Sequence, residues 1–152
     1  MDGLEDLIRI EEIKRLKARY FRLMDTKRWD EWRTLFTDDM RFWNDNEPDP
    51  QDRVQITASG DAFVAMVSKL LAGASTVHHG HMPEIQLTGE RSAAGVWALE
   101  DWIDDPAKGF RYHGFGHYHE TYEKGDDGRW RIKDMHLTRL PLTETMNEDS
   151  EE

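Results

Sequence analysis

Five polar residues lie within or next to apolar stretches of the sequence, where a group that can transfer a proton is costly to bury without a partner. They are Tyr20, Asp25, His78, Asp101 and Arg139. A histidine beside an aspartate can remove a proton from a substrate, because the carboxylate orients the imidazole ring and stabilises its protonated form. A tyrosine hydroxyl can donate a hydrogen bond to a carbonyl, and an arginine can bind an oxyanion or pair with a carboxylate.

Four of these residues also have an ordinary structural explanation. Asp25 follows an apolar helix end, where a capping or turn aspartate is common. Asp101 shares a strand face with apolar residues, but a bulge or an exposed strand end would also account for it. Arg139 alone is typical of an exposed strand end, and Tyr20 is typical of a core position. Local sequence leaves both explanations open.

Three histidines lie close together at positions 78, 79 and 81. Alternate side chains of a strand share a face, so His79 and His81 lie on one face and His78 on the other. At least one of the three is therefore expected to face the interior. A single inward histidine is most often a satisfied structural group, whereas three near one another make a functional role equally reasonable.

The first half of the chain has helical periodicity. Apolar residues recur at spacings of three and four from Leu4 to Met24, which predicts a first helix with Lys14 and Lys17 off its apolar stripe. Asp25-Thr26 can cap a second, short helix that carries Trp29, Trp32, Leu35 and Phe36. A third helix is expected to start near Ser59 or Asp61 and to end at Gly73, burying Phe63, Met66, Val67, Leu70 and Leu71.

The second half has the pattern of strands. The expected strands are Thr76–His81, Glu84–Leu87, Ser92–Asp104, Arg111–Glu123 and Trp130–Leu140. Before the third helix we expect a turn at Thr37-Asp38-Asp39, a short strand from Met40 to Trp43 and an exposed acidic loop over Asn44–Arg53. Helices followed by antiparallel strands predict an α+β fold, with three helices packed on one face of a curved, mostly antiparallel sheet. Residues 4–140 form one domain in this interpretation, and residues 141–152 an acidic tail.

Composition excludes several classes of protein. The 152 residues carry a net charge of −11, which argues against nucleic acid and anionic membranes as partners. The chain has no cysteine, so thiolate catalysis, disulfides and cysteine zinc sites are excluded. No apolar run is long enough to span a bilayer, and the start lacks the regions of a signal peptide, so a cytoplasmic location is expected.

One motif points to a different chemistry. His117, His119 and Glu123 have the His-x-His-x3-Glu spacing of the first cupin metal motif, and alternate strand residues could chelate one metal ion. The flanking glycines are not at cupin spacing, and no second motif of this kind follows. We therefore expect no metal ion in the functional site.

Several stretches together resemble a known superfamily. The stretch from Ile10 to Asp30, the run from Val77 to Ile85 and the segment Gly95–Asp101 are similar to SnoaL-like members of the nuclear-transport-factor-2-like superfamily. Gly128-Arg129-Trp130 and the terminal Leu137–Leu140 strengthen the resemblance. Bacterial bile-acid 7α-dehydratases are the members that the chain resembles most, over residues 5–140. The resemblance implies a cone-shaped fold, an interior pocket and the absence of any cofactor.

The resemblance also implies a site and a reaction. In those dehydratases the positions that match Tyr20, Asp25, His78, Asp101 and Arg139 line the pocket. His78 would then be the general base, oriented by Asp25, in a dehydration of a hydrophobic polycyclic or aromatic substrate such as a 3-oxo-4-ene steroid. Tyr20 would donate to a carbonyl, while Asp101 and Arg139 would assist departure of the hydroxyl or position the substrate. Further pocket residues are expected to be Phe42, Trp43, His81, Trp97, Phe115 and Tyr118.

The resemblance leaves three alternatives open. The chain departs from the relatives on its first strand and in the acidic loop, so the same dyad could remove formaldehyde from lignin-derived diarylpropane diols or isomerise a 3-oxo steroid. A small-molecule binding or oligomerisation module is the non-enzymatic alternative, and it predicts inward polar groups that pair with one another and leave no open cavity. Relatives form dimers or trimers through the outer face of the sheet, so a homo-oligomer is expected, with a trimer favoured over a dimer.

Overall fold

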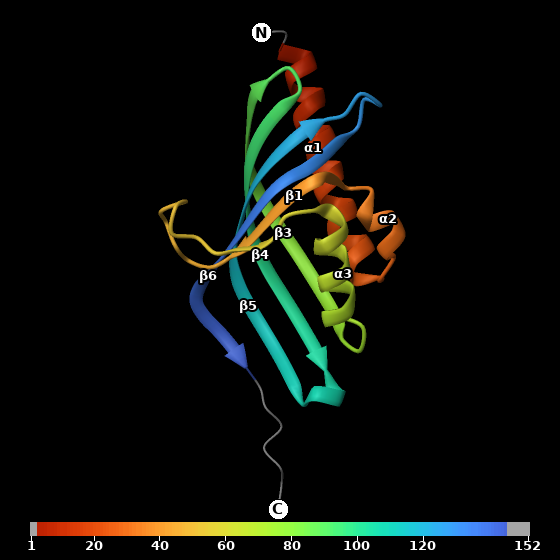
Figure 1. Cartoon of the computed structure of the whole chain (residues 1–152). Helices are drawn as coiled ribbons and strands as arrows, with labels where there is room; N and C mark the ends of the chain where they lie inside the picture. The colour runs from red at the N-terminus through yellow and green to blue at the C-terminus, as the bar shows by residue number, and fades with distance from the viewer. Residues whose placement is uncertain (1–2, 146–152) are drawn as a thin grey trace, which may run out of the picture.

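The computed structural model of the protein describes residues 3–145 and contains three α-helices and a six-stranded sheet. The helices are α1 (Gly3–Asp25), α2 (Trp29–Arg33) and α3 (Gly60–Leu70). All three lie on the same side of the bent sheet (Figure 1). No helix among the described residues combines the length and the apolar character needed to cross a membrane.

The sheet has the order β2-β1-β6-β5-β4-β3. Its strands are β1 (Phe36–Asn44), β2 (Gln55–Thr57), β3 (Ser75–Gly89), β4 (Ser92–Asp105), β5 (Phe110–Lys124) and β6 (Trp130–Thr145). The pair β1 and β6 is parallel, and the other neighbouring strands are antiparallel. A 3₁₀ turn, Pro106–Lys108, connects β4 to β5. The expected α+β cone of the nuclear-transport-factor-2-like type is therefore confirmed.

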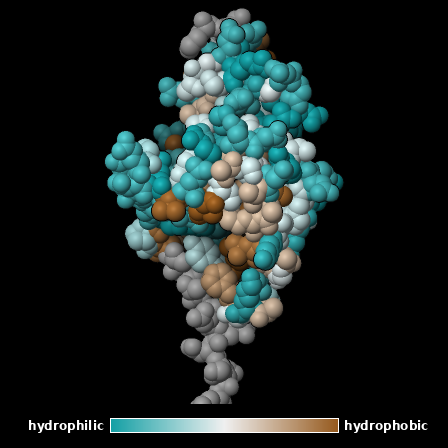
Figure 2. Space-filling view, viewed as in Figure 1, coloured by the Kyte–Doolittle hydropathy of each residue, from teal (hydrophilic) through white to brown (hydrophobic). Residues whose placement is uncertain are grey.

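Large aromatic residues fill the space between the helices and the sheet. Trp32 of α2 is fully buried, and its indole N–H donates to the Tyr20 backbone carbonyl at 3.0 Å, which ties α2 to α1. Phe36 and Phe63 pack against the Trp32 ring from β1 and α3. The surface in Figure 2 is hydrophilic at the end near the N-terminus, whereas apolar residues gather toward its middle and lower part. Burial of aromatic area in this layer is the main force that positions the helices.

The helix boundaries differ from the sequence prediction at several points. Asp25 belongs to α1, and the N-cap position of α2 is Arg28, whose side chain makes no capping hydrogen bond, so the expected cap by Asp25-Thr26 is wrong. Helix α2 ends at Arg33, so Phe36, which was expected in this helix, begins β1 instead. Ser59 caps α3 as expected, because its hydroxyl accepts a hydrogen bond from the Ala62 N–H at 3.0 Å. The helix ends at Leu70, before Gly73, and Leu70 is exposed rather than buried.

The strands are longer than the sequence pattern predicts. The two strands expected on either side of Met82-Pro83 form a single strand, β3, whose register shifts between His81 and Glu84. Proline lacks the N–H of a ladder bond, which explains both the shift and the apparent break in the pattern. The expected turn at 37–39 lies inside β1, and β2 follows the acidic loop. Strand β6 continues past residue 140 into the expected tail, and residues 146–152 lie outside the described part.

Candidate active site

Asp25 and His78 form a tight pair between α1 and β3. The Nδ1 atom of His78 lies 2.6 Å from Oδ1 of Asp25, and the carboxylate also accepts hydrogen bonds from the His78 backbone N–H and the Thr76 hydroxyl, both at 2.9 Å. These three donors offset the unfavourable position of a carboxylate at a helix C-terminus. A carboxylate can only accept, so Nδ1 carries a proton, and in the neutral ring Nε2 holds the free electron pair.

A glycine allows α1 to approach β3 closely enough for this pair to form. A Cβ atom on Gly80 would lie 2.6 Å from the ring of Phe21, so any larger residue would overlap this ring, which packs α1 against β3. The Phe21 ring in turn stacks on His78, with 6.4 Å between centroids and an interplanar angle of 15°. The imidazole is therefore fixed by a carboxylate on one edge and by an aromatic ring on one face.

The other ring nitrogen of His78 points toward a second ion pair. Its Nε2 lies 3.8 Å from Oδ2 of Asp101, which is beyond hydrogen-bond distance. Asp101 is 1% exposed and takes two hydrogen bonds from Arg139, at 2.7 and 2.9 Å. Burial alone would lower the pKa of Arg139, but the hydrogen bonds and the charge of Asp101 outweigh it, and the pKa is raised. Arg139 is thus a permanent cation beside the histidine.

The backbone of Arg139 is held by the acidic loop. The side-chain amide of Asn46 donates to the Arg139 carbonyl at 3.0 Å and accepts from the Arg139 N–H at 2.8 Å. Strand β1 ends at Asn44, opposite Leu137, so this amide continues the pairing along β6 where the backbone ladder stops. The ring of Tyr112 lies 5.2 Å from the guanidinium carbon of Arg139.

Tyr20 and Tyr118 lie deeper in the interior. Their ring centroids are 5.7 Å apart, and each residue is 3% exposed. Burial raises the pKa of both hydroxyls, so they keep their protons. The hydroxyl of Tyr20 lies 3.7 Å from the sulfur of Met135, a weak acceptor, and it also interacts with the hydroxyl of Tyr118. A carbonyl oxygen placed nearby would be a better partner for this proton.

A second buried ion pair was missed by the sequence analysis. Lys17 was expected on the polar side of its helix, but its side chain is fully buried and lies 3.0 Å from the carboxylate of Glu120. The ammonium also lies 3.8 Å from the ring centroid of Tyr20 and 3.6 Å from that of Tyr118. Burial lowers the pKa of Lys17 to about 8 against the opposing attraction of Glu120. Glu120 shares the inward alternation of Tyr118 and Tyr122, which is the signal that could have identified it.

The six expected pocket residues divide between the two faces of the sheet. Phe42, Trp97 and Tyr118 are buried on the face that the helices cover, where the Trp97 indole N–H donates to the Tyr122 hydroxyl at 2.9 Å. Trp43, His81 and Phe115 alternate with buried residues and lie on the outer face. These three are therefore separated from His78 by the sheet. Of the five residues expected to carry chemistry, His78, Asp101 and Arg139 lie on the inner face of the sheet, and Tyr20 and Asp25 belong to the helix that covers it.

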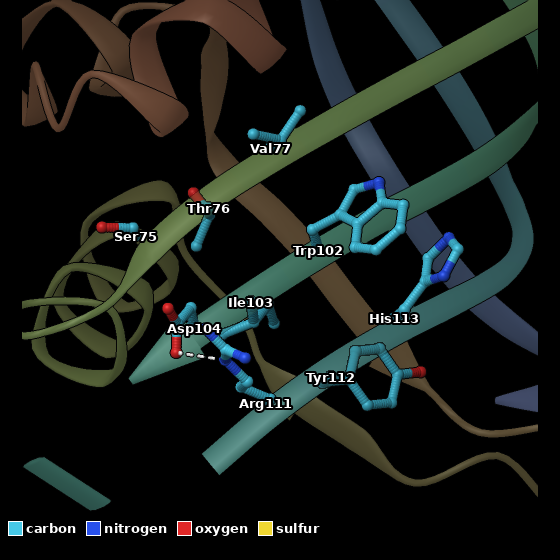
Figure 3. A pocket seen from close by; sticks show the side chains of 9 residues that line it. All are labelled: Ser75, Thr76, Val77, Trp102, Ile103, Asp104, Arg111, Tyr112 and His113. Atoms are coloured by element: carbon cyan, nitrogen blue, oxygen red, sulfur yellow. Dashed lines mark hydrogen bonds and ion pairs between the residues drawn. The ribbon is translucent and has the colours of Figure 1, made fainter. Parts of the chain in front are cut away.

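A cavity of about 380 Å³ lies at the end of the sheet formed by β3, β4 and β5. Three consecutive residues from each of these strands line it, and Figure 3 shows the Asp104–Arg111 ion pair across its lower edge. Thr76 and Tyr112 belong to its lining, but Val77, Trp102 and His113 lie on the outer face of the sheet. None of the five residues expected to carry chemistry lines this cavity.

The cupin-like motif is not assembled into a three-ligand group. Glu123 instead pairs with Lys133 at 3.1 Å, and the His117 and His119 rings lie 6.3 Å apart. Among residues 3–145, the ligand atoms that do converge belong to His79, His81 and Glu100. The sequence motif therefore did not identify the potential metal ligands.

Comparisons with known proteins agree with this architecture. The SnoaL-like domain family matches residues 5–136. A hexachlorocyclohexane dehydrochlorinase aligns with a TM-score of 0.79 at 12% identity, covering 97% of this chain and 95% of that one. A Novosphingobium aromaticivorans protein provisionally named a scytalone dehydratase aligns with a TM-score of 0.73 at 19% identity, and the alignment covers 96% of this chain and 91% of that one. A Mycobacterium tuberculosis protein of unknown function aligns with a TM-score of 0.76 at 23% identity, and the alignment covers 93% of this chain and 78% of that one. These likenesses concern the fold, and with the family match over most of its length the chain belongs to the SnoaL-like domain family.

Proposed function

We propose that the protein is a cofactor-independent lyase that dehydrates a hydrophobic, hydroxylated substrate such as a 3-oxo-4-ene steroid. The observation that carries the proposal is the Asp25–His78 pair, in which Nδ1 is bound at 2.6 Å and Nε2 has no partner within hydrogen-bond distance among the described residues. A histidine in this state is prepared to accept a proton from outside the pair. Similar proteins named dehydrochlorinase and scytalone dehydratase carry out eliminations according to their names, which supports the class of reaction.

In the proposed reaction, Nε2 of His78 removes a proton from the carbon beside the hydroxyl-bearing carbon, which in a 7-hydroxy-3-oxo-4-ene steroid is conjugated to the carbonyl through the ring double bond. The electron pair of the C–H bond forms an enolate, and Tyr20 donates a hydrogen bond to its oxygen, in place of its weak bond to Met135. The enolate then collapses, a new carbon–carbon double bond forms and the C–O bond to the hydroxyl breaks. The imidazolium returns its proton to the departing hydroxide, so that water leaves and His78 is neutral again.

The two aspartates and the arginine have different parts in this proposal. Asp25 stabilises the imidazolium through the hydrogen bond at Nδ1, and Asp101 adds a negative charge 3.8 Å from Nε2. Arg139 donates two hydrogen bonds to Asp101, and the pair positions the substrate or assists departure of the hydroxyl. The Arg139 side chain is 26% exposed, compared with 2% for that of Asp101, so the guanidinium is the member of the pair that can meet a substrate entering from solvent.

The non-enzymatic alternative predicts inward polar groups that satisfy one another. Asp101 with Arg139 and Lys17 with Glu120 fit that description. His78 does not, because one of its nitrogens lacks a bond partner in the part of the chain that the structure describes. This difference is the reason for preferring a lyase to a binding module.

The test is incubation of the purified protein with 7-hydroxy-3-oxo-4-ene steroids and with lignin-type diarylpropane diols, followed by mass spectrometry. Loss of water from a steroid supports the proposal if His78→Ala lowers the turnover by about 10²–10⁴-fold. His117→Ala is the matched control, since His117 lies on the outer face of the sheet and should leave turnover unchanged. Loss of one carbon from a diol, or a shifted double bond without change in mass, would replace dehydration by one of the alternative reactions. Full turnover by His78→Ala would refute the assigned base.

A further inference from the structure

A group of imidazole and carboxylate side chains lies on the outer face of the sheet, on the opposite side from the candidate active site. His79 and His81 belong to β3, and Glu100 belongs to β4. One ligand atom from each residue lies within 4.8 Å of the other two. We propose that His79, His81 and Glu100 bind one divalent transition-metal ion of the zinc or nickel type.

The geometry of the sheet brings the three ligands together. His79 is paired directly with Glu100 across the β3–β4 ladder, and His81 follows two residues later on the same face of β3. The Oε2 atom of Glu100 lies 3.8 Å from Nε2 of His81. Nitrogen atoms bound to one tetrahedral zinc ion are about 3.4 Å apart, so the three side chains need only small rotations to close on the ion. His81 is 54% exposed at its side chain and has the freedom to make that rotation.

The carboxylate is oriented by a further histidine. Oε1 of Glu100 lies 2.9 Å from Nε2 of His113 on β5, which leaves Oε2 directed toward His81. The ring of His113 is stacked on Trp102, with centroids 3.4 Å apart, so its position is itself fixed (Figure 3). Hydrogen bonds of this kind to a ligating carboxylate are a general feature of metal sites and strengthen metal binding.

The donor set determines which ions are expected. Two imidazole nitrogens and one carboxylate oxygen, with water in a fourth position, suit zinc and neighbouring transition metals. Magnesium prefers oxygen ligands in octahedral geometry and should bind far more weakly. Since His79 and His78 point to opposite faces, the ion would lie outside the interior pocket, and the proposal does not depend on the proposed lyase activity.

The experiment is titration of the full chain, without a histidine tag, with zinc chloride and nickel chloride in a calorimeter. We expect one ion per chain for either metal and no comparable binding of magnesium chloride. The double variant His79→Ala/His81→Ala should lose this binding, and Glu100→Gln should weaken it by at least about tenfold. The far-ultraviolet circular dichroism of each variant shows whether it is folded.

The matched control is the double variant His117→Ala/His119→Ala. It removes a second His-x-His pair from the same face of the sheet, but this pair belongs to no converging three-ligand group among the described residues. The control should bind zinc as the unaltered protein does. Zinc binding that survives loss of His79 and His81, or that disappears with His117 and His119, would overturn the proposal. Absence of saturable zinc binding by the unaltered protein would overturn it as well.

Discussion

Replacement of Lys17 by methionine tests the buried ion pair that Lys17 forms with Glu120. Methionine fills much of the same volume but leaves the carboxylate of Glu120 without its cation, and both side chains of the pair are fully buried. The carboxylate would keep only the hydrogen bond from the Tyr122 hydroxyl, at 3.0 Å. Removing one partner of such a pair costs about 3–5 kcal/mol of unfolding free energy. For a domain of this size that loss corresponds to a fall in melting temperature of about 6–20 °C.

Thermal and urea unfolding measure this cost, and the same helix offers a control. Lys14→Met removes an exposed pair in which the ammonium lies 3.7 Å from Glu11, and we expect a change of about 0–1 kcal/mol. The double variant Lys17→Met/Glu120→Gln removes both buried charges and should recover most of the stability lost in Lys17→Met, because no unpaired charge remains. A cost for Lys17→Met as small as that for Lys14→Met would refute the burial of the pair.

Three further predictions concern pH, the acidic loop and a glycine. The pKa of Lys17 is about 8 in the folded chain and higher in the unfolded chain, so above pH 8 the unfolded chain binds more protons than the folded one. Urea unfolding should therefore show that the unfolding free energy of the unaltered protein rises relative to that of Lys17→Met as the pH increases beyond 8. Asn46→Ala removes both hydrogen bonds to the Arg139 backbone and should speed hydrogen exchange of the Arg139 amide by about tenfold or more, measured by NMR. Gly116→Ala should unfold at markedly lower urea concentration, because a Cβ there would overlap the backbone carbonyl of Thr138, whereas Gly3→Ala, with open space around it, should not.

The sequence predicts the inner-face residues of the sheet at the candidate site because strand alternation marks them. Asp101 shares one face of its strand with Trp97 and Leu99, and the structure confirms that it is buried between strands that do not bulge at this point. The same alternation places the side chain of His78 on the opposite face of β3 from those of His79 and His81. Alternation cannot show which helix residue meets the histidine. That Asp25 does so depends on the packing of α1 on β3 at Gly80, which is a tertiary contact.

The residues whose predicted positions were wrong differ from the prediction for physical reasons. Lys17 directly follows the buried Leu16, and a lysine at the edge of an apolar stripe is normally solvated. Only the inward carboxylate of Glu120, more than a hundred positions away, makes its burial possible. Trp43 was expected in the pocket because the relatives have a pocket tyrosine on this strand, and Phe115 because its stretch is rich in aromatic residues. Alternation with Phe42 and Gly116 places both on the outer face. Alternation along the strand, and not the aromatic character of a residue, determines which face of the sheet its side chain occupies.

The helix α1 links the two ion-paired regions of the interior. Lys17, Phe21 and Asp25 are spaced by four residues and lie along one face of the helix, so the sealed ammonium and the dyad carboxylate are about 12 Å apart along its axis. The pair at Lys17 has no exposed atom, whereas Asp25 and Arg139 retain 20% and 26% of side-chain exposure. Proton exchange with a substrate needs access from solvent. The same helix therefore contributes Lys17 to a fully buried ion pair and Asp25 to a dyad whose carboxylate is partly exposed.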